Sequence, residues 1–194
     1  MTTYRDCEER TDEELVKLTL ADQEWYLCLM RRYESKLSRY IRRISGLNEQ
    51  DLEDVLQDIF IKAYRNLNAF DPDLKFNSWI YRIAHNEAIS RYRKLKTRPQ
   101  LVKGEEGEKM LALIEDKGNP EEKLDNKISR EKIQGILAQM DLKYREVLTL
   151  KYLEEKDYKE ISDIVKKPMG TVGTLINRAK KQFRAIANEQ RTEF

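Results

Sequence analysis

Apolar residues recur every three or four positions along most of the chain, which is the period of an amphipathic helix. The first such stretch opens at Thr11, because Thr11 and Glu14 have the spacing of a capping box. The periodicity continues to about Ile44, and Gly46 follows as a residue suited to the left-handed turn that ends a helix. The pattern therefore predicts one helical stretch between Thr11 and Gly46.

Two more helices are predicted before the middle of the chain. The first covers about residues 49–67, where the apolar positions form one continuous stripe. A loop follows over residues 68–76, and the next helix covers about residues 79–96. Ser78 or Asn77 is expected to cap that helix, because both side chains can accept a bond from the first free backbone amides.

Residues 97–123 lack a clean period, and their prolines, glycines and acids predict a tether with a short helix near Met110–Ile114. Helical spacing then returns over residues 124–140, 144–153, 158–165 and 168–187. We therefore expect an all-α fold of two small helical domains joined by a flexible acidic linker. The expected organisation is an N-terminal extension (1–10), a first helical domain (11–96), the linker (97–123) and a second helical domain (124–194).

Composition agrees with this fold class and excludes others. Charged residues make up 37% of the 194 residues, above the usual value of about 25%. The 40% of hydrophobic residues is too low for a membrane protein and too high for a disordered one, and 7 Gly with 4 Pro disfavour a turn-rich β fold. The N-terminus has no apolar signal region and no apolar run approaches the ~18 residues of a membrane span, so a cytoplasmic protein is expected.

The chain has few residues for metal or disulfide chemistry. It contains two cysteines, Cys7 and Cys28, which cannot build a disulfide framework or a zinc knuckle. They are expected to be small helix residues in a reducing cytosol. The single histidine, His85, makes a histidine-cluster metal site implausible.

The formal net charge is only +2, but the charges are segregated along the chain. Three stretches are strongly basic, at Leu29–Arg43, Lys75–Arg98 and Lys166–Arg184, while Glu49–Asp58 holds five acids and no base. Between the last two basic stretches, Leu101–Glu131 is acidic. This favours two polyanion-binding modules on a tether and a separate acidic surface for a protein partner. Ordinary solvated helix faces would give a similar pattern.

The C-terminal part has the pattern of a helix-turn-helix, in the segment YKEISDIVKKPMGTVGTLINRAKKQFR. The second helix has a buried stripe of Val172, Leu175, Ile176, Ala179 and Phe183. Its other face shows Gly173, Thr174, Asn177, Arg178 and Lys181, the short polar and basic side chains that a recognition helix uses on base edges and phosphates. A helical hairpin with a solvated basic face is the alternative.

Aromatic and basic residues interleave on and before the predicted helix 79–96. Rings give stacking surfaces for unpaired bases while Lys and Arg follow phosphates. The residues are Phe70, Phe76, Trp79, Tyr81 and Tyr92, with Lys75, Arg82, Arg91, Arg93 and Lys94. The rings would equally suit a core, and Trp79 is expected to be at least partly buried. His85 and Asn86 are polar residues in mid-helix that could contact a base edge or serve as caps.

The acidic helix presents Glu53, Asp54, Gln57 and Asp58 away from its buried stripe. A protein-binding surface is the favoured interpretation, and a plain solvated face is the simplest alternative. A third possibility is Mg²⁺ held by Asp51, Asp54 and Asp58 in a helical phosphohydrolase. That site would need carboxylates from a second helix, and the neighbouring helices are basic.

Two stretches resemble a known family. DLEDVLQDIFIKAYRNLNAFDPDLKFNSWIYRIAHNEAISRYRK looks like region 2, and YREVLTLKYLEEKDYKEISDIVKKPMGTVGTLINRAKKQFR like region 4, of bacterial RNA polymerase sigma factors of the extracytoplasmic function type. The resemblance implies a promoter-specificity subunit that binds core RNA polymerase, recognises −35 and −10 elements, helps to melt the −10 region and initiates transcription of a specialised regulon. It implies no catalysis, cofactor or metal of its own.

The resemblance also implies roles for individual residues. The core-polymerase surface would be Glu53, Asp54, Gln57 and Asp58. The −10 element would be bound by Phe70, Lys75, Phe76, Ser78, Trp79, Arg82, His85, Asn86, Arg91, Arg93 and Lys94. The −35 element would face Thr171, Gly173, Thr174, Asn177, Arg178 and Lys181. The chain departs from the family at Gly173, where a basic residue is common, so its −35 preference is expected to be unusual or weak.

The resemblance implies partners as well: core RNA polymerase, promoter DNA and an anti-sigma factor, which could hold the protein at the membrane although the chain itself does not insert. No small-molecule substrate is expected. Two other functions remain open from the residues: a stand-alone helix-turn-helix regulator, which would bind duplex DNA without polymerase, and the Mg²⁺-dependent phosphohydrolase.

Overall fold

The computed structural model describes residues 7–71, 74–97 and 131–192, and these residues form helices without a β-strand. The predicted all-α fold is therefore confirmed. The elements are α2 (Asp12–Ala21), η1 (Gln23–Trp25), α3 (Tyr26–Ser45), α4 (Glu49–Arg65), η2 (Leu67–Ala69), α5 (Phe76–Thr97), a helix over 131–139, α7 (Leu142–Leu148), η4 (Thr149–Leu153), α8 (Tyr158–Val165) and α9 (Met169–Thr192). The predicted short helix at Met110–Ile114 and nearly all of the predicted linker lie outside the described residues.

The N-terminal helical stretch is divided in two, contrary to the continuous pattern expected from the sequence. The Thr11–Glu14 capping box is present, and α2 ends at Ala21. The next residue, Asp22, is extended at φ −148° and ψ 115°, and its carboxylate accepts a bond of 3.0 Å from the Glu24 amide. The helical spacing of apolar residues continues across the break because the 3-10 helix η1 begins directly after Asp22. Gly46 ends α3 in the left-handed conformation, as predicted.

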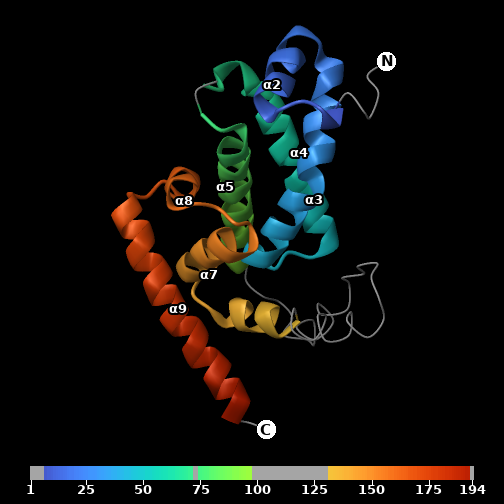
Figure 1. Ribbon diagram of the computed structural model, residues 1–194. Coiled ribbons are helices and arrows are strands. Elements are labelled where there is room, and N and C mark those ends of the chain that lie inside the picture. Colours follow the sequence, from blue (N-terminus) through green and yellow to red (C-terminus); the bar gives the residue numbers. More distant parts are fainter. Residues whose placement is uncertain (1–6, 72–73, 98–130, 193–194) are drawn as a thin grey trace.

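Helices α3, α4 and α5 form the centre of the first helix group, with α2 across one end (Figure 1). Its core contains large side chains that are almost completely buried, including Leu37, Tyr40, Ile59 and Ile80. Helix α5 begins at Phe76, three residues earlier than expected. The cause is a tertiary cap: the carboxylate of Glu13, on α2, accepts the Phe76 amide at 3.1 Å. Ser78 is buried within the first turn of α5 and so does not precede it as a cap.

The second helix group contains the helix over 131–139, α7, η4, α8 and α9 (Figure 1). Helix α8 has the predicted bounds, with a capping box between Asp157 and Glu160 and a left-handed Lys166 at its end. Helix α7 does not continue unbroken to Leu153, because its last turn, η4, is π-helical. Of the stripe predicted for the second helix, Val172, Ile176 and Ala179 of α9 are completely buried, while Leu175 and Phe183 are half-buried.

Cys7 and Cys28 are joined by a disulfide, which corrects the expectation of two separate thiols. The two residues are 21 positions apart, but their Cα atoms lie 5.3 Å apart. The break at Asp22 lets α2 fold back along α3, so the start of the described chain meets the start of α3. Periodicity alone could not show this, because the unbroken helix that it predicted would keep the two cysteines far apart.

Candidate nucleic-acid interface

The exposed face of α9 carries the residues that the sequence predicted for duplex DNA. Thr171, Thr174, Asn177, Arg178 and Lys181 are exposed. They lie opposite the buried stripe, so the α-helical period presents them together on one surface. The face has three uncharged polar side chains and two cations, and no acid, which suits base edges and phosphates.

Gly173 lies at the edge of this face and is half-buried. A Cβ at this position would lie 3.6 Å from Cε1 of Tyr158, the first residue of α8. That distance is an ordinary van der Waals contact, so a side chain could be accommodated there. Thr174 already donates its hydroxyl to the Gly170 carbonyl at 3.0 Å, which leaves its oxygen lone pairs for a ligand.

The aromatic residues near the start of α5 form a buried cluster. Phe70, Phe76 and Trp79 are 7%, 1% and 8% exposed, and their ring centroids lie 5.4–5.6 Å apart. Edge-to-face and tilted packing of this kind stabilises a core. In this conformation the three rings pack the first helix group and cannot stack on bases, which was the alternative that the sequence had left open.

The polar residues expected at the −10 element are only partly accessible. Asn86 is exposed and Arg82 is half-buried. His85 is buried: its Nδ1 lies 3.0 Å from the Tyr40 hydroxyl, and its Nε2 lies 3.8 Å from the carboxylate of Glu146 on α7. Burial lowers the pKa of His85 to about 4. His85 is therefore a neutral residue of the interface between the two helix groups.

Basic residues near the C-terminal end of α5 have two different surroundings: Arg91 forms an ion pair, and Arg93 and Lys94 line an open cleft. The Arg91 guanidinium binds the Asp51 carboxylate, with Nε at 3.2 Å, and lies 3.7 Å from Asp54. Arg93 and Lys94 are exposed. Both line a cleft of about 740 Å³ between α5 and the second helix group, together with Asn86, Ser90, Lys143 and Lys167. The arrangement brings cations of both groups to one opening, which Asp141 and Glu146 also line.

The two helix groups are packed against each other through polar contacts that the sequence analysis missed. Glu154, just after η4, accepts from Arg43 at 2.8 Å and from the Tyr81 hydroxyl at 2.7 Å. Lys156, which is 7% exposed, donates to the Asn77 side chain at 2.9 Å. The sequence EEKD around these residues reads as a solvated turn, so no local pattern could have revealed their partners.

Two further contacts join the groups, one just before α5 and one near the end of α3. Lys75 lies 3.2 Å from Glu160 and 3.9 Å from Asp157, both at the start of α8. Arg145 of α7 donates to the Ile44 carbonyl at 3.0 Å, near the end of α3. Lys75 and Asn77, at the start of α5, thus each contact the second group, although Lys75 keeps 65% of its side chain exposed.

The acidic face of α4 is exposed, as the sequence predicted. Glu53, Asp54, Gln57 and Asp58 all point away from the core, and Asp54 keeps 61% of its side chain accessible. Among the described residues, no group of His, Cys, Asp and Glu is placed to hold a metal ion. Asp51 is bound to the Arg91 guanidinium, which also lies 3.7 Å from Asp54.

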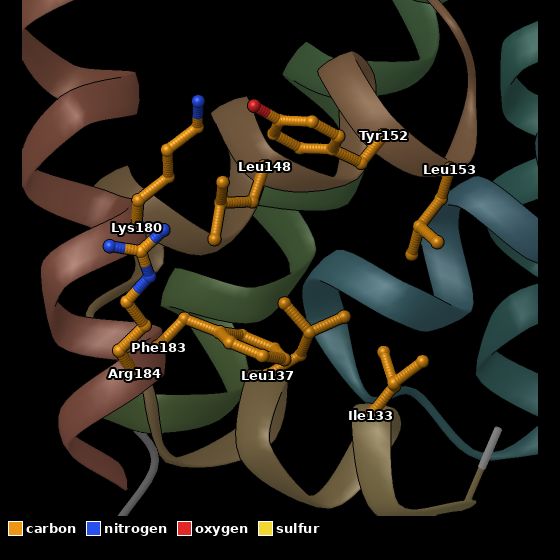
Figure 2. Close-up of a pocket in the computed structure, with 8 residues that line it drawn as sticks. All are labelled: Ile133, Leu137, Leu148, Tyr152, Leu153, Lys180, Phe183 and Arg184. Atoms are coloured by element: carbon orange, nitrogen blue, oxygen red, sulfur yellow. The ribbon is translucent and has the colours of Figure 1, made fainter. Parts of the chain in front are cut away.

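An apolar cavity of about 230 Å³ opens on the second helix group, a feature that the sequence analysis did not anticipate. Figure 2 shows the ring of Phe183 reaching from α9 toward Leu137, with Leu148 and Tyr152 above them. Lys180 and Arg184 stand at its edge. An apolar floor with cations at the rim can accept an amphipathic helix that carries acidic side chains.

Comparison with known proteins gives the same two regions. Residues 29–98 match the protein family described as Sigma-70 region 2, and residues 130–183 match the family described as Sigma-70, region 4. In fold, the chain is similar to CnrH, solved in complex with the cytosolic domain of CnrY, with a TM-score of 0.68, 23% identity and coverage of 92% of this chain and 97% of that one. It is also similar to the sigma factor RpoE of Bartonella quintana, solved with the anti-sigma factor NepR, with a TM-score of 0.64, 17% identity and coverage of 88% and 98%.

Curated relatives are closer in sequence. The ECF RNA polymerase sigma factor SigW of Bacillus subtilis (strain 168) is 36% identical over 167 residues, which are 84% of this chain and 89% of that protein. The ECF RNA polymerase sigma-E factor of Escherichia coli (strain K12) is 33% identical over 180 residues, which are 90% and 93%. None of the helices in the described ranges is long and apolar enough to cross a membrane. With both regions present in order and relatives matched over nearly their whole length, the chain belongs to the extracytoplasmic function (ECF) sigma factors of bacterial RNA polymerase.

Proposed function

We propose that this chain is a promoter-specificity subunit that binds core RNA polymerase, reads the −35 element with α9 and the −10 element around α5, and has no catalytic activity of its own. The observation that carries the proposal is the pairing of two different surfaces on one chain. The exposed face of α9 offers Asn177 and Arg178 for base edges, and α4 offers an acid-rich face to a protein. A DNA-binding regulator working alone would have no use for the second surface.

The proposed division of labour follows the domain boundaries expected from the sequence, 11–96 and 124–194. Arg178 can pair bidentately with guanine and Asn177 with adenine, while Lys181 follows a phosphate. In the first domain, Asn86, Arg93 and Lys94 are exposed and are proposed to bind the −10 region. The buried rings are proposed to support that surface rather than to bind bases in this conformation.

The packed arrangement is proposed to be a resting state. Lys75 and Asn77 lie on the −10 side of α5, and both are bound to residues of the second helix group. Promoter binding would require these contacts to be exchanged for DNA phosphates and bases. We therefore propose that core polymerase separates the two groups and that an anti-sigma factor holds them together, which would keep the protein in the cytoplasm or at the membrane surface.

The decisive experiment is run-off transcription with core polymerase and a library of promoter fragments, with and without the protein. We expect transcripts from a small set of fragments only when both are present. A second arm measures binding of the same fragments to the protein alone. Tight, sequence-specific binding without polymerase, and no stimulation with it, would favour the stand-alone regulator instead. The matched control is Arg178→Ala, which should lose selection among fragments but keep core binding.

A further inference from the structure

The Cys7–Cys28 disulfide joins the start of the described chain to the first turns of α3, and promoter recognition makes no use of it. Transcription takes place where thiols are kept reduced, and disulfides in such compartments are usually transient or redox-sensing. We propose that Cys7 and Cys28 form a reversible redox modification site whose disulfide state fastens the N-terminal segment and thereby holds the start of α5, beside the aromatic cluster that supports the proposed −10 surface. The effect on promoter opening rests on the proposed function, whereas the redox site itself does not.

The first step is how the segment is attached to α3. One turn after Cys28, the guanidinium of Arg32 binds the Cys7 carbonyl, and it also binds the Arg10 carbonyl at 2.9 Å and the Asp12 carboxylate at 2.6 Å. The disulfide and Arg32 are therefore two adjacent points of attachment for the same short segment. When the disulfide is reduced, the polar contacts of Arg32 remain as the main tie, and these exchange readily with water.

The second step connects this segment to α5. Asp12 accepts a hydrogen bond from the Tyr33 hydroxyl, and the Tyr33 ring packs edge-on against Phe76 with 5.5 Å between centroids. The next residue, Glu13, accepts the Phe76 amide at 3.1 Å. Residues 12 and 13 therefore cap and support the beginning of α5. A segment that opens more often would release this cap and loosen the aromatic cluster beside the −10 surface.

The chemistry needs only a low-molecular-weight disulfide as oxidant. One cysteine thiolate attacks that disulfide and forms a mixed disulfide, releasing one small thiolate. The second cysteine thiolate then attacks the mixed disulfide, forms the Cys7–Cys28 bond and releases the second small thiolate. The protein loses two electrons and two protons, and the small disulfide gains both to become two thiols. Cys7 and Cys28 are 8% and 3% exposed, so exchange in either direction requires the segment to open locally.

The test uses the full chain equilibrated in glutathione buffers of graded ratio, followed by alkylation and a mass count of modified thiols. We expect two alkylated cysteines in the most reducing buffer and none in the most oxidising one. Hydrogen exchange in residues 7–12 and at the Phe76 amide should be slower in the oxidised form, by roughly 100-fold for a cross-link that closes a loop of this length. Permanganate footprinting with core polymerase should show several-fold more −10 opening for the oxidised form.

Cys7→Ser serves as the matched variant, because it removes the bond at the edge of the fold and leaves Cys28 inside α3. It should behave as the reduced protein in every buffer. Two reactive thiols at all glutathione ratios would overturn the redox site, and a disulfide that leaves hydrogen exchange at Phe76 unchanged would overturn the coupling. If neither redox form opens any promoter, the proposed function fails, while alkylation and exchange still decide whether the redox site exists.

Discussion

The ammonium of Lys156 lies 4.2 Å from the centroid of the Tyr81 ring, so a lysine that follows η4 is buried against α5 of the other helix group. Burial lowers the pKa of Lys156, and its ammonium donates a hydrogen bond to the side-chain oxygen of Asn77. This contact belongs to neither helix group alone. It stabilises only the packed arrangement, in which the second group lies against the start of α5.

Lys156→Ala should therefore favour separation of the two groups. The change removes a cation–π contact and a hydrogen bond, together worth about 1–3 kcal/mol in a partly desolvated site. Small-angle X-ray scattering should show a larger radius of gyration for the variant. Lys159→Ala, an equal loss of charge on the exposed face of α8, should leave the scattering unchanged. Identical curves for both variants would contradict a locking role for Lys156.

The buried pair His85 and Glu146 predicts a pH dependence of stability. Burial lowers the pKa of His85 from 6.5 to about 4, so its contribution is complete above pH 6.5 and is lost as the pH falls toward 4. Burial raises the pKa of Glu146 from 4.5 to about 7, so its contribution is present below pH 4.5 and is lost as the pH rises through 7. Between pH 4 and pH 7, titration of His85 therefore makes stability rise with pH, and titration of Glu146 makes it fall.

Glu146→Gln should separate these trends. Above pH 7 the wild type carries a buried charge that the variant lacks, so the variant should be more stable there by on the order of 2–3 kcal/mol. Urea unfolding at pH 5 and pH 8 measures the difference. We expect a small difference at pH 5, where the folded carboxyl is protonated, and a larger one at pH 8. An equal difference at both pH values would show that Glu146 does not titrate in this range.

The acidic face of α4 predicts a specific loss of polymerase binding. Asp54→Lys with Asp58→Lys reverses two exposed charges on the proposed interface, and charge reversal at a complementary surface can cost several kcal/mol. Helical content should not change, because neither side chain belongs to the core. The control is Glu34→Lys with Glu189→Lys, the same charge change on exposed positions of α3 and α9. Core affinity that falls equally in both variants would indicate only a general charge effect.

Trp79 and Asn86 should separate structure from function in α5. Trp79 is buried in the ring cluster, so Trp79→Ala should lower the free energy of unfolding by about 3–5 kcal/mol. Asn86 is exposed, so Asn86→Ala should leave stability nearly unchanged while it reduces permanganate reactivity at the −10 region. Normal −10 opening by Asn86→Ala would mean that this part of α5 is not the reading surface.

Much of the fold could be predicted because it depends on local pattern. The stripe of Val172, Ile176 and Ala179 and the capping boxes at Thr11 and Asp157 are each specified by residues within a few positions of one another. The helix class follows from such features. The exposed polar face of α9 could be predicted for the same reason, since it is the complement of the buried stripe.

The features that the sequence analysis missed depend on distant partners. Helix α5 starts early because Glu13 reaches its first amide across the fold, and Cys7 meets Cys28 because Asp22 breaks the chain between them. Glu154 likewise has its partners more than seventy residues away. Periodicity carries no information about such contacts. For a related reason, the sequence did not decide whether the aromatic residues bind DNA or pack in the core, because the same rings can stack on a base or fill a buried space.

Variants of α9 should distinguish base reading from a general effect of charge. Arg178 is exposed beside the buried Ala179 and can form two hydrogen bonds with guanine. Lys181 is exposed almost one turn further along, where the helix should pass the DNA backbone. Arg178→Ala should therefore relax the preference at one −35 position and cost about 1–3 kcal/mol, while Lys181→Ala should weaken all promoters alike and lower the salt slope by about one.

Gly173→Arg is the complementary gain. A Cβ there meets Tyr158 at an ordinary contact distance, so the backbone of α9 can accept a side chain at this position, and the added cation should strengthen DNA binding. The measurement for all three variants is transcription from a panel of single-base −35 promoters at two salt concentrations. If Arg178→Ala lowers every promoter by the same factor, Arg178 contacts only phosphate. Specificity would then have to come from base contacts by Asn177 or Thr174, which lie on the same exposed face of α9, or from the sequence-dependent shape of the DNA.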